Sequence, residues 1–183
     1  MIDEHGWLDD CRRLPSPNYD QRPDSFGASP SLLVIHNISL PPGQFGGGHI
    51  EAFFRNELSV FEHPFFSEIA QLKVSAHALI DREGLVTQFV SFKDRAWHAG
   101  ASVYAGIERC NDFSIGIELE GTDIDPYTDE QYTALVNLTR LLLKTYPGIT
   151  TSKIVGHCDV APGRKTDPGM SFDWYRYLTS LLI

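Results

Sequence analysis

The sequence predicts an α/β fold in which helices flank a mixed central β-sheet. Three observations lead to this prediction. Short apolar runs rich in β-branched residues, at 31–36, 113–119 and 153–157, are typical of buried strands. Two further β-type runs at 74–90 surround a turn signal, which is typical of a hairpin. The segment 128–146 carries apolar residues at the helical period, which predicts a long amphipathic helix.

In the first part of the chain the residue pattern predicts one strand and one helix. Residues 1–29 are rich in Pro, Asp and Arg without periodicity, so we expect irregular structure packed on the domain. The run 31–36 is a strand whose last residue is His36. The proline- and glycine-rich loop 41–48 is expected to be mobile, and a helix is expected over 49–60.

The second part contains a hairpin and the clearest helix. Strands at 74–80 and 85–90 flank the turn Asp81-Arg-Glu-Gly84. After the strand 113–119, Thr128 and Gln131 have the spacing of a capping box. Pro147-Gly148 then ends the helix, the strand 153–157 follows, and a short helix starts at about Phe172.

Length and composition limit the classes of function. At 183 residues the chain fits a single domain over 1–183. The formal charge of −9 disfavours binding to nucleic acid or anionic polymers. The acidic amino terminus does not have the pattern of an export signal, and no apolar run reaches about 20 residues, so we expect a cytoplasmic protein without a membrane span. Three cysteines without CxxC spacing disfavour disulfides.

A candidate metal site follows from three polar residues near strand ends. His36 and His157 each end an apolar strand, where side chains from several strands can converge. Asp167 lies in the loop after His157 and precedes Pro168, whose ring restricts the backbone. Two histidines and one carboxylate, with a fourth position left to water, are the ligand set of a catalytic zinc site. Spacing alone does not establish that His36 meets His157.

Other polar residues have simpler interpretations. Cys158 follows His157 directly, and adjacent strand residues point in opposite directions, which disfavours it as a ligand. His77 is expected to be a hydrogen-bonded structural residue rather than a substrate contact. His98 either orders a groove beside Trp97 or forms hydrogen bonds in the core. The phenylalanines between 53 and 66 are expected to pack over the site. The glycines at 46–48 lack the lysine of a phosphate loop.

Several long motifs occur in one order and resemble those of the AmpD-type amidases, cytoplasmic 1,6-anhydro-N-acetylmuramoyl-L-alanine amidases of the N-acetylmuramoyl-L-alanine amidase type 2 family. The resemblance runs from about Trp7 to Trp174. It is carried by His36 after a Leu-Val-Ile strand, Trp97-His-Ala-Gly100, Arg109-Cys-Asn-Asp112, Ser114-Ile-Gly-Ile-Glu118, Gly156-His-Cys-Asp159 and Arg164-Lys-Thr-Asp-Pro-Gly169. The resemblance implies the amidase type 2 fold, which peptidoglycan-recognition proteins share, and a small muropeptide as substrate, with no obligatory protein partner.

The resemblance also assigns roles to residues of this chain. It implies one Zn²⁺ per chain, held by His36, His157 and Asp167. It makes Glu118 the catalytic glutamate and Lys165 the catalytic lysine. Substrate recognition is assigned to three further residues, Asn37, Trp97 and Arg109.

These roles match the needs of amide hydrolysis. Zinc lowers the pKa of its bound water to about 7 and polarises the carbonyl group. Glu118 can accept a proton from that water and pass it to the departing amine, while Lys165 stabilises the oxyanion. Strand alternation places Glu118 and Glu120 on the same face, so periodicity alone does not choose between them. Two rival functions are a recognition module without catalysis and a wall-degrading or phage-type amidase.

Overall fold

The computed structural model describes residues 1–24 and 29–182, and in these residues the strands form a mixed central sheet with two small ones beside it. The central sheet has six strands in the spatial order β1 (Arg12–Arg13), β5 (Val86–Gln88), β4 (Ala78–Ile80), β9 (Ser114–Glu120), β3 (Leu32–Ile38) and β10 (Ile154–Gly156). Strands β4, β9, β3 and β10 are parallel, whereas β5 runs antiparallel to β4. The predicted mixed α/β fold is confirmed.

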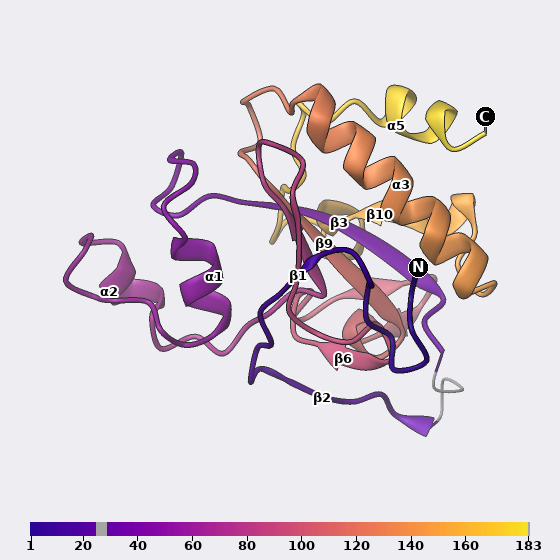
Figure 1. The fold of residues 1–183 in the computed structure, drawn as a ribbon, viewed down its shortest axis with the longest axis horizontal. Coiled ribbons are helices and arrows are strands. Elements are labelled where there is room, and N and C mark those ends of the chain that lie inside the picture. Colours follow the sequence, from indigo (N-terminus) through magenta and orange to yellow (C-terminus); the bar gives the residue numbers. More distant parts are fainter. Residues whose placement is uncertain (25–28, 183) are drawn as a thin grey trace.

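Helices cover the sheet unevenly (Figure 1). The long helix α3 (Asp129–Thr145) packs on one face with α5 (Trp174–Ser180) beside it, and α1 (His49–Phe54) and α2 (Phe66–Ile69) lie together at one end of the molecule. The short helix α4 (His157–Val160) follows β10 directly. The smaller elements are the paired strands β2 (Tyr19–Gln21) and β6 (Asp94–Ala96), the paired strands β7 (Val103–Tyr104) and β8 (Ile107–Glu108), and the 3₁₀ turns η2 (Cys110–Asp112) and η3 (Thr151–Lys153).

The two faces of β3 and β9 have different surroundings. Side chains alternate between the faces of a strand, so odd and even positions separate. The odd positions are apolar and pack in the core that contains α3; they are Leu33, Ile35, Ile115, Ile117 and Leu119. The even positions Leu32 and Val34 begin a second core on the opposite face, and His36 and Glu118 continue that face toward the carboxyl ends of the strands. The polar residues therefore lie where buried hydrophobic packing gives way to a pocket.

Helix α3 confirms the predicted amphipathic helix and its capping box. Thr128 Oγ1 accepts a hydrogen bond from the Gln131 backbone N–H at 3.1 Å, and Gln131 Oε1 accepts one from the Thr128 N–H at 3.1 Å. Tyr132, Leu135 and Leu142 on its inner face are buried. The helix ends at Thr145, two residues before Pro147, since proline disfavours helical backbone in the residue before it.

The hairpin β4–β5 is also confirmed, but its strands are shorter than predicted: they cover Ala78–Ile80 rather than 74–80 and Val86–Gln88 rather than 85–90. Asp81 Oδ1 accepts from the backbone N–H groups of Glu83 and Leu85, which closes the turn. Gly84 has φ +80°, a conformation that other residues rarely adopt. A Cβ at Gly84 would also lie 2.7 Å from the carbonyl oxygen of Glu130, at the start of α3.

Sequence prediction was wrong for parts of the amino-terminal segment. Residues 1–29 were expected to be irregular, but β1 pairs with β5 and β2 pairs with β6. Both strands are two or three residues long and depend on partners about 75 residues away, so no local periodicity marks them. Residues 25–28 of this segment lie outside the described part of the chain.

Three predicted element boundaries were also wrong. Strand β3 continues two residues beyond His36 because Asn37 and Ile38 still pair with β9. Helix α1 ends at Phe54 rather than at residue 60, and Asn56 with φ +61° follows it. His157 is the first residue of α4 rather than the last residue of a strand, because Asp159 Oδ2 accepts from the Gly156 N–H at 2.7 Å and turns the chain into a helix.

No helix in the described part of the chain is both long and apolar enough to cross a membrane.

We predict that Thr128→Ala lowers the free energy of unfolding by about 1 kcal/mol, because it removes the side-chain cap of α3. Urea denaturation followed by circular dichroism measures this loss. Thr133→Ala is the control, because the exposed Thr133 hydroxyl bonds only the carbonyl of Asp129 within the same helix. Equal losses from the two substitutions would show that the cap contributes nothing particular.

Candidate metal centre

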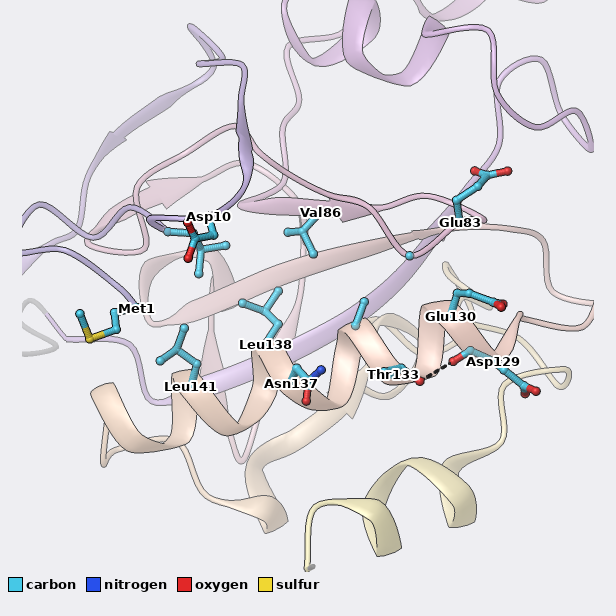
Figure 2. A pocket seen from close by; sticks show the side chains of 13 residues that line it. Met1, Asp10, Glu83, Val86, Asp129, Glu130, Thr133, Asn137, Leu138 and Leu141 are labelled. Atoms are coloured by element: carbon cyan, nitrogen blue, oxygen red, sulfur yellow. Dashed lines mark hydrogen bonds between the residues drawn. The ribbon is translucent and has the colours of Figure 1, made fainter.

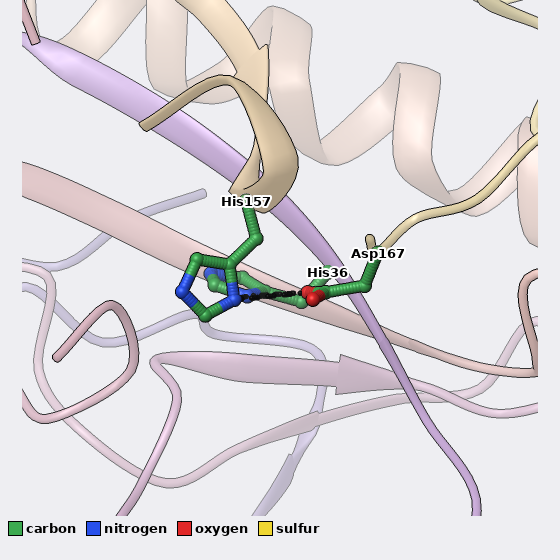
Figure 3. A group of neighbouring side chains, drawn as sticks. All are labelled: His36, His157 and Asp167. Carbon is green, nitrogen blue, oxygen red and sulfur yellow. Dashed lines mark hydrogen bonds and ion pairs between the residues drawn. The ribbon is translucent and has the colours of Figure 1, made fainter. Parts of the chain in front are cut away.

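Three side chains from separate segments converge at the carboxyl ends of β3 and β10 (Figure 3). His36 belongs to β3, His157 begins α4, and Asp167 lies in the loop after α4. His36 Nδ1 and His157 Nδ1 are 2.9 Å apart, and each lies 3.0 Å from Asp167 Oδ2. The structure thus brings together the three residues that the sequence selected as candidate ligands.

The donor set suits a divalent metal ion such as zinc. Zinc–ligand distances of about 2.0–2.2 Å at tetrahedral angles separate neighbouring ligand atoms by about 3.3–3.6 Å. The observed separations of 2.9–3.0 Å are a few tenths of an ångström shorter, so a small adjustment of the side chains accommodates the ion. Two imidazole nitrogens and one carboxylate oxygen leave a coordination position free.

Hydrogen bonds at the Nε2 atoms orient the rings of His36 and His157. His157 Nε2 lies 3.1 Å from the carbonyl oxygen of Ala99, which only accepts hydrogen bonds, so Nε2 carries the proton and Nδ1 keeps a free lone pair. His36 Nε2 lies 2.9 Å from His98 Nδ1, and His98 Nε2 lies 3.1 Å from Ser114 Oγ. A chain of donors from His36 through His98 to Ser114 leaves Nδ1 of His36 free in the same way.

Glycine at position 116 makes room for His98. A Cβ built on Gly116 would lie 2.4 Å from two atoms of the His98 ring, well inside van der Waals contact. Gly116 lies on β9 on the same face as Glu118. The sequence Ser114-Ile-Gly-Ile-Glu118 therefore carries the space for His98 as well as a pocket carboxylate.

Burial and charge separate the protonation states of the ligand candidates. Burial lowers the pKa of His36 to about 4, with Asp167 opposing that shift. Burial alone would raise the pKa of Asp167, but its hydrogen bonds to His157 and His36 outweigh burial and hold that pKa well below its usual value. His36 is therefore neutral and Asp167 charged near neutral pH, which are the forms that bind metal ions.

Glu118 lies beside this group. It pairs directly with His36 across the two strands, so both side chains project from the same face of the sheet. Burial raises the pKa of Glu118 well above its usual value, Asp167 raises it further, and Lys165 opposes the shift. Among the described residues, Oε2 of Glu118 has no hydrogen-bond partner. A buried carboxyl group without a structural bond is suited to exchange a proton with a bound molecule.

Glu120 has a different contact. Its Oε1 accepts a hydrogen bond from the Gly46 N–H at 2.5 Å, which ties the loop 41–48 to the end of β9. Glu118 lines the pocket with the metal-ligand candidates, and Glu120 does not. The structure therefore separates two glutamates that periodicity left equivalent.

A pocket of about 390 Å³ contains these groups. Its apolar wall comes mainly from α1, α2 and the segments beside them and includes Phe53, Phe54, Phe65, Ile69 and Leu72. This agrees with the expectation that aromatic residues pack over the site, except for Phe61, which is 96% exposed.

The predicted recognition residues differ in position. Asn37, Trp97 and Lys165 line the pocket. Asn37 Nδ2 donates to Asp123 Oδ1 at 2.9 Å, and Trp97 Nε1 donates to Asp20 Oδ1 at 3.1 Å. Arg109 lines a neighbouring hollow instead, where its φ is +62° and its Nε lies 3.4 Å from Asp112 Oδ2.

The structure also tests the expectations for Cys158 and His77. Cys158 is not part of the group that can hold a metal ion, but the strand argument against it was wrong, because His157 and Cys158 lie in α4. Neighbouring helix side chains instead diverge by about 100°. His77 is structural, since its Nδ1 accepts from the Gly116 N–H at 3.0 Å and its Nε2 lies 3.1 Å from the Asp94 carbonyl oxygen.

A second hollow, of about 590 Å³, lies between α3, the amino-terminal segment and the β4–β5 hairpin (Figure 2). Its floor includes Leu138 and Val86, and its rim carries acids such as Glu83 and Glu130. Among the residues that the structure describes, its lining contains no histidine, cysteine, lysine or arginine. The candidate metal ligands therefore lie in the other pocket.

Sequence reasoning left the contacts of His98 undecided and missed the carbonyl of Ala99, the space at Gly116 and the bond from Trp97 to Asp20. The motif Trp97-His-Ala-Gly100 contains both His98 and Ala99, so it marks them as part of one segment. No pattern in the sequence marks Asp20, because its partner is 77 residues away.

We predict that Gly116→Ala lowers the free energy of unfolding by about 1–3 kcal/mol, because the new methyl group overlaps the His98 ring. Urea denaturation measures the change. The same substitution in a His98→Ala background should have almost no effect, since the ring is gone. Equal losses in the two backgrounds would place the cause elsewhere than in contact with His98.

The chain is similar in sequence to proteins of one family. A family model described as N-acetylmuramoyl-L-alanine amidase matches residues 26–170. The chain is 57% identical over 178 residues to the 1,6-anhydro-N-acetylmuramyl-L-alanine amidase AmpD of Haemophilus influenzae, covering 97% of this chain and 96% of that protein.

The fold of the chain is also similar to solved structures of amidases. A crystal structure of an AmpD selenomethionine derivative superimposes with a TM-score of 0.94 at 56% identity and covers 99% of both chains. The amidase AmiD of E. coli, in complex with anhydro-N-acetylmuramic acid-L-Ala-D-γ-Glu-L-Lys, superimposes with a TM-score of 0.61 at 26% identity, covering 98% of this chain and 65% of that one.

Proposed function

The chain belongs to the N-acetylmuramoyl-L-alanine amidase family, and on this basis we propose that it is a zinc-dependent amidase in peptidoglycan recycling. It hydrolyses the amide bond between the lactyl group of 1,6-anhydro-N-acetylmuramic acid and the L-alanine of the stem peptide. The observation that carries the proposal is the convergence of His36, His157 and Asp167 beside the buried Glu118 in one pocket.

The substrate class is supported by the relatives and by the pocket. AmpD of Haemophilus influenzae is named for the anhydromuramyl-L-alanine bond, and the AmiD structure contains an anhydromuramoyl tripeptide. A pocket of about 390 Å³ is of the size that holds small ligands. Its aromatic wall suits the apolar face of a sugar ring, and Asn37 and Lys165 offer polar groups to a peptide.

Zinc bound by His36, His157 and Asp167 would supply an activated water and polarise the scissile carbonyl. Glu118 accepts the proton of the attacking water and returns it to the departing nitrogen of L-alanine. Lys165 is exposed at the pocket and has no ion pair in the described part of the chain, so its ammonium group is available to the developing oxyanion.

A recognition module without catalysis is the alternative that the same fold allows. Glu118 argues against it, because burying a carboxyl group without a hydrogen bond is unfavourable and a binding role does not require it. The expected cytoplasmic location, the single-domain organisation and the lack of an obligatory protein partner stay predictions.

The first experiment is mass spectrometry of anhydromuramoyl tripeptide incubated with metal-analysed protein. We predict release of free tripeptide and intact anhydromuramic acid, abolished by a chelator and restored by zinc. Binding of one zinc ion without cleavage would instead favour the recognition module.

We predict that Glu118→Gln lowers kcat by about 10²–10⁴-fold, because it removes the group that transfers protons. Zinc content should remain that of the unmodified protein, since Glu118 is not among the three ligand candidates. Glu120→Gln is the matched control on the same strand and face, and its kcat should change little. Comparable losses in both variants would remove the assignment of Glu118 as the base.

We predict that Asp167→Ala loses zinc during dialysis, because two imidazoles alone bind the ion weakly. Elemental analysis after dialysis against metal-free buffer measures the retained zinc. Asp173→Ala is the control, since Asp173 caps α5 and lies outside the ligand group. Full zinc occupancy in Asp167→Ala would contradict its role as a ligand.

A further inference from the structure

Four charged side chains of alternating sign lie in a row beside Trp97: Asp20, Arg95, Asp112 and Arg109. Arg95 holds Asp20 with two hydrogen bonds, from Nε to Oδ1 at 2.6 Å and from Nη2 to Oδ2 at 2.5 Å. Its third nitrogen, Nη1, donates to Asp112 Oδ1 at 2.5 Å. Arg109 contacts the other oxygen of Asp112 at 3.4 Å. Arg95 therefore joins both carboxylates in one rigid arrangement.

The row ends on the indole of Trp97. Trp97 Nε1 donates to Asp20 Oδ1, the same oxygen that accepts from Arg95 Nε. Nε1 is the only polar atom of the tryptophan side chain, so this bond fixes the ring about its two side-chain torsions. The backbone of Trp97 is fixed separately, because its N–H donates to Ser75 Oγ and its carbonyl accepts from the Ser75 N–H.

The row of charged side chains lies outside the pocket that contains the proposed catalytic groups. Trp97 lines the pocket, whereas neither Asp20 nor Arg95 does. The hydrogen bonds from Arg95 lower the pKa of Asp20, so its carboxylate is charged near neutral pH and is a strong acceptor for the indole. The Asp20 side chain is 43% exposed and that of Arg95 is 17% exposed, and the two-pronged contact holds the carboxylate in one place beside the indole. One consequence of the arrangement is the orientation of the ring.

We propose that Asp20 and Arg95 are positioning residues that hold Trp97 in the wall of the substrate pocket and thereby set the affinity for the muropeptide. This inference rests on the proposed function, and it assigns a substrate-affinity role to a β2–β6 pair outside the pocket. Asp20 and Arg95 are directly paired across these two strands. Loss of either side chain frees the indole to rotate, which weakens substrate binding and leaves proton transfer at Glu118 unaffected.

The test compares steady-state kinetics on anhydromuramoyl tripeptide for Asp20→Ala, Trp97→Phe and the double variant. Asp20→Ala should raise KM about tenfold with kcat and zinc content unchanged, as for the loss of a charge-assisted hydrogen bond. In the Trp97→Phe background, Asp20→Ala should have no further effect, because Asp20 acts through the indole. Multiplying effects, or an unchanged KM in Asp20→Ala, would overturn the proposal.

Two further variants test the specificity of the effect. Arg95→Lys keeps the charge but loses the two-pronged contact, so it should raise KM in the same direction. Asp129→Ala also removes an aspartate from an arginine pair, with Arg176 at 2.8 Å, but it lies on α3 away from the pocket. Its KM should equal that of the unmodified protein, and an equal rise in both aspartate variants would refute the proposal.

A measurement without substrate separates this inference from the proposed function. Acrylamide quenching of Trp97 fluorescence, obtained by subtracting the signal of Trp97→Phe, reports how well the ring is held. Quenching should rise in Asp20→Ala and stay unchanged in Asp129→Ala. Failure of the unmodified protein to cleave the tripeptide would remove the proposed function, whereas unchanged quenching in Asp20→Ala would remove the positioning role.

Discussion

The pairing of β3 with β9 is the constraint on which the rest of the site depends. The two strands pair in parallel over their whole length. This register places His36 directly beside Glu118 on one face of the sheet. A shift of either strand by one residue would turn its own polar side chain, His36 or Glu118, into the apolar core under α3 and bring Ile35 or Ile117 into the pocket. Hydrophobic burial on one face thus fixes the positions of His36 and Glu118 on the other, since the core tolerates only one register.

The segment from Arg95 to Ala99 transmits this fixed geometry to the other groups. Three consecutive residues of this segment contact the site in different ways. Trp97 forms part of the pocket wall, His98 accepts a hydrogen bond from His36, and the Ala99 carbonyl oxygen accepts one from His157. The segment is itself held by Asn111, whose Oδ1 accepts from the N–H groups of His98 and Ala99 at 3.2 and 2.8 Å. The turn η2, with no side chain in the pocket, therefore determines the orientation of both histidine rings.

What could be predicted from the sequence divides along physical lines. Signals that act within one element were sufficient: the apolar period and the cap of α3, the turn at Gly84, and the buried runs of β3 and β9. Strands β1 and β2 were missed because their stability comes from distant partners, Thr87 and Ala96 among them. His157 was placed in a strand because the Asp159 side chain, rather than an apolar period, turns the chain there. The candidate metal ligands could be identified from their side-chain chemistry and from the family resemblance. Asp20 and Gly116 could not, because their importance lies in contacts that form only in the folded chain.

The two pocket carboxylates show how environment divides roles between similar groups. Asp167 lies against two imidazoles, which outweigh the effect of burial on its pKa and keep it charged. Glu118 is buried, and its Oε2 has no hydrogen-bond partner in the part of the chain that the structure describes. The charge of Asp167 adds to its tendency to hold a proton. A cation between the histidines and Asp167 would cancel that repulsion and lower the pKa of Glu118 toward the range in which it can both accept and return a proton. In the proposed enzyme, metal binding and proton transfer at Glu118 would therefore be coupled through Asp167, so a change at this residue would affect both together.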